Sequence, residues 1–225
     1  MEKIYTGFKQ LDENVTIKTG ELVVIASRPA IGKTSFVCNI VKNTIDNQKI
    51  LFFSMQIKEH MAINSLIEYA KSNNKKLHLE QKVCDIDDVC LKVAELKIKQ
   101  GLDLVIIDNF WDFINCSHFS ENELVTQLKK MALKLDVCII ITSEMARSEF
   151  FYSTYSDIHH KTLIFKADKI FAIYRPDLIY SEEDCEIECI KKGVAVVSLE
   201  KDVNSNWHGE ASLKFNENEL TFTEI

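Results

Sequence analysis

The architecture of this chain follows from the stretch Val23-Val24-Ile25-Ala26-Ser27-Arg28-Pro29-Ala30-Ile31-Gly32-Lys33-Thr34-Ser35. It begins as a run of β-branched apolar residues, turns through small residues, and opens an amphipathic helix that we predict from residue 36 to residue 45. The turn fits the phosphate-binding pattern GxxxxGK[ST] over residues 27–34, with Ser27 in place of the first glycine. Strand, loop and helix in this order predict a site for nucleotide phosphates.

The residue types in the loop suit this chemistry. Gly32 lets the backbone curl without a Cβ clash, so that successive N–H groups and the positive end of the helix dipole face a pair of phosphates. Lys33 adds a mobile cation, and the Thr34 hydroxyl is placed to bind Mg²⁺. The alternative is an ordinary turn with surface polar residues, and the flanking strand and helix argue against it. The residues predicted to contact the nucleotide are Ser27, Arg28, Pro29, Ala30, Ile31, Gly32, Lys33, Thr34 and Ser35.

The composition predicts one soluble domain. The chain has 225 residues, of which 46% are hydrophobic, so it can bury one sizeable core and we expect a single domain over residues 1–225. No stretch is long and apolar enough to cross a membrane, and the first residues lack the apolar segment of a signal peptide. The seven cysteines are an odd number, which favours reduced thiols over a disulfide framework. The predicted location is therefore cytoplasmic, without a membrane partner.

The rest of the chain alternates between strand-like and helix-like segments. Apolar runs predict strands at 21–26, 49–54, 104–108, 137–143 and 170–174, and helical spacing of apolar residues predicts helices at 57–71, 86–99 and 120–135. This alternation is typical of a parallel sheet with helices on both faces. Strands at 194–200, 210–215 and 220–223 are expected to close the sheet, the last two as a hairpin around 216–218. The predicted fold class is α/β, with a mostly parallel central sheet and a C-terminal antiparallel hairpin.

The third strand ends in an acid, Asp108, after four apolar residues. A carboxylate at the C-terminal end of a parallel strand beside a phosphate loop is the Walker B arrangement, in which it holds Mg²⁺. We therefore predict Thr34 and Asp108 as the metal ligands. Glu144 and Arg147 follow the next strand, where a sensor of the γ-phosphate would lie, and a capped helix start with an outward arginine is the alternative that spacing leaves open.

Further segments along the chain carry a family resemblance. They lie at 6–8, 11–12, 26–34, 106–108, 143–147, 156–157, 167–168, 173–175 and 197–201. In this order they resemble the C-terminal ATPase domain of DnaB-type replicative helicases, over nearly the whole chain. The resemblance implies a RecA-like P-loop NTPase fold, ATP and Mg²⁺ as cofactors, Arg175 as a nucleotide contact, and a hexameric ring that moves on single-stranded DNA. On the same basis we expect the family's N-terminal domain and linker helix to be absent, since Met1 stands at the start of the ATPase core.

One departure from the family concerns the attacking water. The family segment resembles Ser-Leu-Glu-Met, whose glutamate positions the water, whereas this chain has Ser54-Met55-Gln56-Ile57. Gln56 can hydrogen-bond a water but cannot accept its proton as a carboxylate does. Glu144 stands where the family usually has a glutamine sensor, and it is the carboxylate that we nominate as a substitute. Hydrolysis is therefore expected to be slow.

A second departure lies where the family presents Lys-x-Arg to the nucleotide of a neighbouring subunit. Here the segment is Lys201-Asp202-Val203, so the lysine is kept and the arginine finger is replaced by valine. Losing such a finger commonly costs about 10³- to 10⁵-fold in rate in phosphoryl-transfer systems. Lys201 remains a predicted catalytic residue, while Val203 adds to the expectation of weak turnover.

The acidic balance limits binding to DNA. The formal net charge is −7, and residues 158–161 replace the family's arginine-bearing stretch that approaches the strand. Trp111 either stacks on a base or, as is more usual beside a strand end, belongs to the core. Single-stranded DNA is therefore expected to bind weakly. The pairs His159/His160 and Cys185/Cys189 do not have the spacing of a closed zinc site.

Two functions remain open. The first is an ATPase coupled to DNA unwinding or translocation in DNA replication or mobile-element DNA metabolism, with hydrolysis rescued by Glu144 or by a partner's arginine. The second is a nucleotide-binding interaction protein, whose ATP-bound state sets association with a replicative helicase or another replication component. A homo-oligomer is also an expected assembly. Gln56, Val203 and the net charge favour the second, while overall similarity favours the first.

Overall fold

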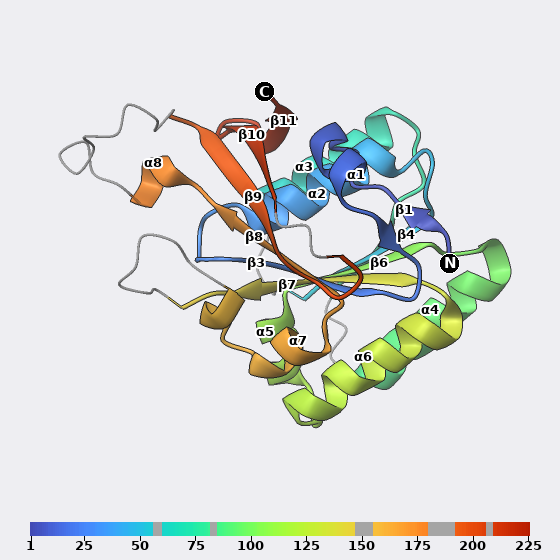
Figure 1. Cartoon of the computed structure of the whole chain (residues 1–225). Coiled ribbons are helices and arrows are strands. Elements are labelled where there is room, and N and C mark those ends of the chain that lie inside the picture. Colours follow the sequence, from blue (N-terminus) through green and yellow to red (C-terminus); the bar gives the residue numbers. More distant parts are fainter. Residues whose placement is uncertain (56–59, 82–84, 147–154, 180–191, 206–208) are drawn as a thin grey trace.

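The computed structural model describes residues 1–55, 60–81, 85–146, 155–179, 192–205 and 209–225 (Figure 1). Its strands are β1 (Lys3–Ile4), β2 (Ile17–Lys18), β3 (Leu22–Ser27), β4 (Ile50–Ser54), β5 (His78–Gln81), β6 (Leu104–Asp108), β7 (Cys138–Glu144), β8 (Lys169–Tyr174), β9 (Val194–Asp202), β10 (Glu210–Asn216) and β11 (Thr221–Glu224). Its helices are α1 (Lys9–Asn14), α2 (Lys33–Thr44), α3 (Met61–Ser72), α4 (Ile86–Gln100), α5 (Phe110–Cys116), α6 (Glu121–Leu135), α7 (Lys161–Lys166) and α8 (Pro176–Ile179), with a short 3₁₀ turn at Tyr155–Asp157.

One large mixed sheet forms the centre of the molecule. Its strand order is β11-β10-β9-β8-β3-β7-β6-β4-β5. The strands from β8 to β5 pair in parallel, whereas β9, β10 and β11 pair antiparallel along one side. In this order β3 lies between β7 and β8, and β6 is the next strand beyond β7. The C-terminal ends of β3, β7 and β6 therefore meet at one edge of the sheet, which is where ligands of open α/β sheets bind.

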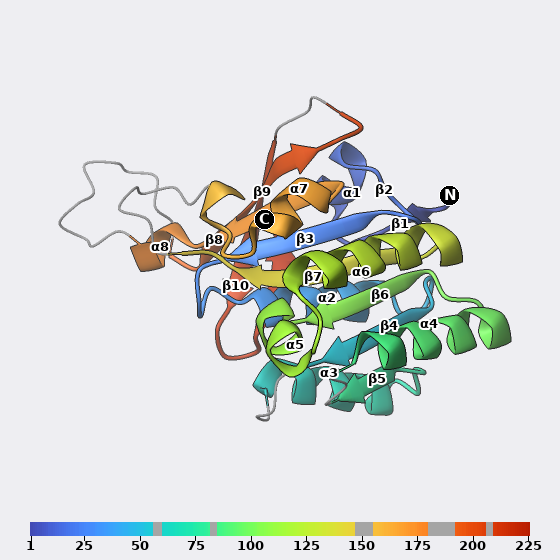
Figure 2. The same cartoon turned by 90° about the horizontal axis from the view of Figure 1, so that it is seen from below.

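Two layers of helices cover the sheet (Figures 1 and 2). Helices α1, α2 and α3 lie over one face, and α4, α5, α6 and α7 lie over the other. Alternate residues of β3 feed the two cores, since Val23 and Ile25 pack with the first layer while Leu22, Val24 and Ala26 pack with the second. Side chains of a strand point to opposite faces in turn, so a central strand covered on both sides must be apolar at every position. This explains why the predicted strands appear as continuous apolar runs.

The structure confirms the predicted α/β sheet and its C-terminal antiparallel hairpin. Every strand predicted from an apolar run is present, with ends that shift by a few residues. Several short elements were not predicted, among them β1, β5, α5, α7 and α8. Strand β5 contains a single apolar residue, Leu79, so its sequence pattern is that of a polar loop. It lies at the edge of the sheet, beside β4.

Helix α5, one of the elements not predicted, follows β6 directly, where a loop was expected. Asn109 caps it, since its side-chain oxygen accepts a hydrogen bond from the backbone N–H of Asp112 at 2.9 Å. Trp111 lies on this helix with 52% of its surface exposed, so of the two roles left open for it, the place in the core that its position favoured is wrong. Among the described residues, none of the helices has the length and apolar character needed to cross a membrane.

A buried ion network holds the opposite edge of the sheet, at the N-terminal ends of β3 and β8. The Lys169 side chain is fully buried, and its Nζ atom donates hydrogen bonds to Glu21 at 3.1 Å and Asp202 at 2.9 Å. Asn204 donates a further hydrogen bond to Glu21 at 2.9 Å. The ammonium group thus ties the residue before β3 to the end of β9. Removing it would leave two carboxylates buried without their cation.

We predict that Lys169→Met destabilises the protein by about 3–5 kcal/mol, because methionine fills the space but leaves Glu21 and Asp202 unpaired. The unfolding free energy from urea titration followed by circular dichroism measures this effect. Lys9→Ala is the control, because Lys9 is 75% exposed in its pair with Glu13, and exposed pairs contribute at most about 1 kcal/mol. Equal midpoints for Lys169→Met and the unaltered chain would contradict the prediction.

Candidate functional site

The phosphate loop lies between β3 and α2 and has the backbone of an anion-binding turn. Ala30 has φ of 63° and Gly32 has φ of 113°, both in the left-handed region. Gly32 is the N-cap residue of α2 and has no side chain with which to bond the first N–H groups of the helix. A Cβ atom at Gly32 would lie 3.3 Å from Phe222 Cζ, tighter than nine in ten real Cβ contacts. The positive φ of Gly32 therefore favours glycine here, and a side chain would also have to displace the Phe222 ring by a few tenths of an ångström.

Lys33 begins α2 and points back over the loop. Its Nζ atom lies 3.3 Å from each of the Ser27 carbonyl oxygen, the Ser27 hydroxyl and the Arg28 carbonyl oxygen. Burial lowers the pKa of Lys33, and the carboxylates of Glu144 and Asp108 oppose that shift. The ammonium group is thus held above the loop by neutral oxygens, which an anionic ligand would replace with a charged partner.

Asp108, at the end of β6, joins the start of α2 to β7. Its two carboxylate oxygens accept hydrogen bonds from the Thr34 hydroxyl at 2.9 Å and the Thr142 hydroxyl at 2.5 Å. Burial raises the pKa of Asp108, and hydrogen bonds from Thr142 and Thr34 offset part of the rise. The oxygens of Thr34 and Asp108 are hard donors at adjacent positions, which is the ligand type that Mg²⁺ takes beside a phosphate. Thr34 and Asp108 therefore fit the Mg²⁺ site that the sequence predicts.

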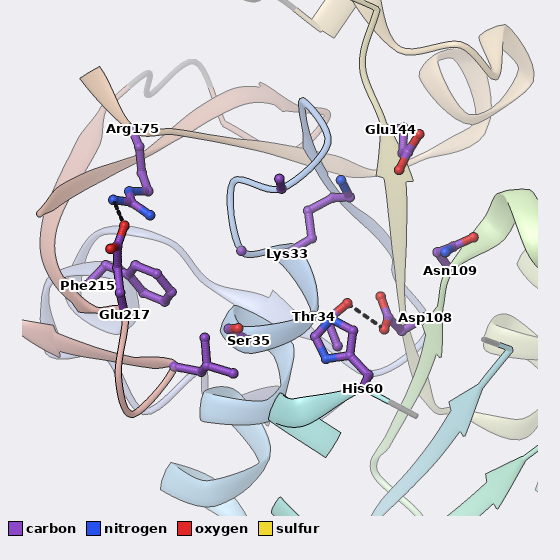
Figure 3. Close-up of a pocket in the computed structure, with 13 residues that line it drawn as sticks. Lys33, Thr34, Ser35, His60, Asp108, Asn109, Glu144, Arg175, Phe215 and Glu217 are labelled. Carbon is purple, nitrogen blue, oxygen red and sulfur yellow. Dashed lines mark hydrogen bonds and ion pairs between the residues drawn. The ribbon is translucent and has the colours of Figure 1, made fainter. Parts of the chain in front are cut away.

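Two further side chains, His60 and Asn109, line the cavity near Asp108 and were missed in the sequence (Figure 3). His60 is the N-cap residue of α3, and its side chain accepts a hydrogen bond from the backbone N–H of Ala62 at 3.2 Å. Asn109 follows Asp108 and caps α5. Asn109 has a local sequence signal, since asparagine followed three residues later by an acid is a common helix start. His60 has no comparable signal.

The antiparallel hairpin forms the far wall of the cavity. Arg175 is buried, its guanidinium lies 4.9 Å from the centre of the Phe215 ring, and it pairs with Glu217 at 2.7 Å and Asp177 at 3.2 Å. Burial by itself would lower the pKa of Arg175, but these two carboxylates raise it overall. Figure 3 shows Arg175, Phe215 and Glu217 on one side and Asp108, Asn109 and Glu144 on the other, with Lys33 between them.

The cavity enclosed by these elements measures about 380 Å³. Of the residues predicted from sequence, it brings together Ala30, Gly32, Lys33, Thr34, Ser35, Asp108, Glu144 and Arg175. The predicted contacts Ser27, Arg28, Pro29 and Ile31 belong to the loop or the strand before it but are not part of the wall. Gln56, Arg147, Cys185 and Cys189 fall outside the described residues. The roles of Gln56 and Arg147 stay predictions.

Lys201 lies away from this cavity, near the end of β9. Its Nζ atom donates hydrogen bonds to the carbonyl oxygens of Ile164 at 2.8 Å, Phe165 at 3.3 Å and Ala167 at 2.7 Å. Burial lowers the pKa of Lys201, and Asp168 opposes that shift. The lysine thus caps the C-terminal end of α7, where cations are favourable. Val203, in the arginine-finger position, is 56% exposed.

Known proteins resemble this chain in sequence and structure. A family model described as "DnaB-like helicase C terminal domain" matches residues 3–83. The "Probable plasmid replicative DNA helicase" of Chlamydia psittaci is 27% identical over 178 residues, which cover 63% of this chain and 39% of that protein. The "Replicative DNA helicase DnaB" of Geobacillus stearothermophilus is 25% identical over 224 residues, covering 81% and 49%. The chain thus spans about half or less of the length of these relatives.

The fold has a match among solved structures. One described as "The Structure Of A DnaB-Like Replicative Helicase And Its Interactions With Primase" superposes with a TM-score of 0.81 at 22% identity, covering 99% of this chain and 62% of that one. At this identity the likeness establishes the fold, which is RecA-like. It agrees with the strand order and with the place of the phosphate loop at the C-terminal edge of β3.

The buried carboxylate of Asp108 leads to a prediction for the ligand-free protein. In the unfolded chain this carboxyl titrates near its ordinary pKa of 3.8, whereas burial raises the pKa in the fold. Above the unfolded pKa the native state binds more protons, so the unfolding free energy falls as pH rises towards the folded pKa. Asp108→Asn removes this titration. We therefore expect the unfolding free energy of Asp108→Asn, relative to that of the unaltered chain, to increase as pH rises from about 4 to about 8.

Urea titrations of both proteins at several pH values, without magnesium or nucleotide, measure this shift. Asp103→Asn is a matched control, because Asp103 precedes the same strand at the opposite end and only its contact with the backbone N–H of Lys49 at 2.8 Å changes. If the difference in unfolding free energy between Asp108→Asn and the unaltered chain does not vary with pH, the raised pKa of Asp108 in the folded protein is refuted.

Proposed function

We propose that this chain, a DnaB-type C-terminal RecA-like domain, binds ATP with Mg²⁺ beside the phosphate loop, hydrolyses it weakly, and serves DNA replication or related DNA metabolism. One observation carries the proposal. A lysine that opens a helix after a glycine turn shares a single cavity with a threonine hydroxyl bonded to the buried acid of a neighbouring strand. This combination provides a cation, backbone N–H groups and hard oxygen ligands at one place, which together suit a magnesium triphosphate.

The cavity walls suggest how the nucleotide would lie. The phosphates would occupy the loop at the N-terminus of α2, where Lys33 exchanges its carbonyl partners for phosphate oxygens. The nucleoside would extend towards Arg175 and Phe215, where the guanidinium and the ring are already stacked. The terminal phosphate would then point towards Asp108 and Glu144. An aromatic ring and a paired guanidinium give the planar surface that a base requires.

Thr34 and Asp108 would hold the metal. When bound, Mg²⁺ neutralises charge on the β- and γ-phosphates. The Thr34 hydroxyl donates to Asp108 at 2.9 Å, so the two oxygens that would bind the metal already lie beside each other. The Thr142 hydroxyl keeps its hydrogen bond to the other Asp108 oxygen and so continues to orient the carboxylate.

Weak hydrolysis follows from the residues that would act on the attacking water. Gln56 cannot take up a proton, and Val203 cannot supply the charge of an arginine finger. Glu144 ends β7 in the wall of the cavity and is the carboxylate proposed as a substitute base. Lys201 would have to release three carbonyl oxygens of the α7 region before it could reach a neighbouring subunit.

The second candidate function is a nucleotide-binding interaction protein. Its support is the same pair of departures, together with a net charge of −7 that provides no general attraction for single-stranded DNA. In this form ATP is held but hardly cleaved, and the bound state governs association with a replicative helicase or another replication component. Weak binding of single-stranded DNA remains part of the first candidate function.

We predict that Lys33→Ala weakens binding of magnesium ATP by about tenfold or more, because it removes a charge-assisted hydrogen bond to phosphate. Isothermal titration calorimetry on the full chain measures the affinity. Lys9→Ala, an exposed lysine on α1, should bind as the unaltered chain does. Thermal unfolding of each variant shows whether it is folded. Equal affinity for a folded Lys33→Ala and the unaltered chain would reject the site.

Turnover of the unaltered chain separates the two candidate functions, and Gln56→Glu tests why that turnover is weak. We expect turnover to rise by about 10²- to 10⁴-fold in this variant, because a carboxylate can act as general base for the attacking water. Phosphate release is measured with and without single-stranded DNA, with Gln56→Asn as the control that keeps an amide. Rapid, DNA-stimulated turnover by the unaltered chain would contradict weak hydrolysis and favour the ATPase coupled to DNA unwinding or translocation.

A further inference from the structure

His60 lies in the wall of the cavity, on the same side as Asp108 (Figure 3). It comes from the N-cap position of α3, an element that carries no phosphate-binding motif. Its imidazole is close enough to Asp108 for a charge on one group to influence the other. An aromatic ring with two nitrogens thus stands where the terminal phosphate of the proposed nucleotide would end.

The hydrogen bond made by one ring nitrogen fixes what the other can do. The backbone N–H of Ala62 donates to His60 Nδ1 at 3.2 Å, so Nδ1 carries no proton. A neutral imidazole then has its hydrogen on Nε2, which makes that atom a donor. A donor cannot serve as a general base or as a metal ligand until the ring changes tautomer and loses the cap bond. A phosphate oxygen, in contrast, is the acceptor that such a donor requires.

The position of His60 is set by packed elements. The Lys42 ammonium group of α2 donates to the Ser65 hydroxyl of α3 at 2.9 Å, and the Tyr69 hydroxyl donates to the Lys42 carbonyl oxygen at 3.4 Å. The helix that carries His60 is therefore fixed against the helix that begins with Lys33. The N-terminal end of α3 also bears a partial positive charge, which adds to the attraction for an anion.

On the basis of the nucleotide site proposed above, we propose that His60 contacts the terminal phosphate of the bound nucleotide through Nε2–H, so that the site distinguishes a nucleoside triphosphate from a diphosphate. The β-phosphate is held by the loop in both ligands, whereas the γ-phosphate exists only in the triphosphate. His60 thereby couples the presence of that phosphate to the start of α3.

Two substitutions separate this role from helix capping. His60→Asn keeps an oxygen that caps α3, since asparagine is among the best N-cap residues, but it is too short to reach the phosphate. His60→Gln is a weaker cap but carries an amide N–H farther along the side chain. A purely structural role therefore predicts that Asn is tolerated and Gln is not, whereas a phosphate contact predicts the reverse for affinity.

The experiment is isothermal titration calorimetry of the full chain with magnesium and either AMP-PNP, a non-hydrolysable triphosphate, or ADP. We expect His60→Asn to lower affinity for AMP-PNP by about ten- to a hundredfold and to leave affinity for ADP within about twofold. We expect His60→Gln to regain part of the lost preference. Thermal unfolding of each variant reports the state of the helix cap.

The outcomes are distinct. If the ratio of the AMP-PNP and ADP affinities is unchanged in His60→Asn, the role of His60 is overturned while the nucleotide site stands. This holds whether both affinities are kept or both fall equally, as expected of a metal contact. Failure of the unaltered chain to bind either ligand overturns the nucleotide site, and the role of His60 with it.

Discussion

The buried carboxylate of Asp108 is the constraint on which the proposed site depends. Two hydroxyls, from the start of α2 and from β7, donate hydrogen bonds to its oxygens, and the side chain is almost wholly buried. A buried charge without such partners is costly, so the hydrogen bonds hold β6, β7 and α2 in one arrangement. The oxygens proposed to bind the metal are consequently in place before any ligand arrives. Burial costs stability in the ligand-free protein, and the raised pKa of Asp108 reflects that cost.

The antiparallel side of the sheet completes the cavity from the other direction. Phe36 of α2 packs edge to face with Phe222, which in turn contacts Phe215. Gly32 lies against the same phenylalanines, so the loop and the hairpin share one apolar contact. Arg175 then reaches the cavity from the end of β8 by stacking on Phe215. The shape of the nucleoside end of the site thus depends on residues that come late in the chain.

Binding and hydrolysis depend on different residues of this chain. The groups proposed to bind phosphate and metal are in one cavity and have hydrogen-bond partners that a ligand can replace. The groups that the family resemblance assigns to hydrolysis are Gln56, which lacks a carboxylate, Val203, which lacks a cation, and Lys201, which caps α7. This contrast is the physical ground for proposing weak turnover. His60 and Glu144 both lie in the cavity wall, where we propose that they act on the terminal phosphate and on the attacking water, respectively.

Local pattern was sufficient for the phosphate loop, the acid of β6 and most strands. A glycine turn between an apolar strand and a helix is short-range information, and strands buried on both faces are apolar throughout. The edge strand β5 and helix α5 escaped because one is mostly polar and the other is a short helix that follows a strand directly. Trp111 was misjudged because exposure depends on what packs over a residue, which spacing does not report.

The convergence of His60, Arg175 and Phe215 on the loop was settled by the folded chain. These residues belong to α3, β8 and the hairpin, and they meet Lys33 because parallel pairing brings the ends of separate strands to one edge while the antiparallel hairpin folds over it. The donor role of His60 likewise depends on the folded chain. The start of α3 places the backbone N–H of Ala62 where it donates to Nδ1, which leaves the hydrogen of the neutral ring on Nε2. Residue types set the available chemistry, and long-range packing set which groups act together.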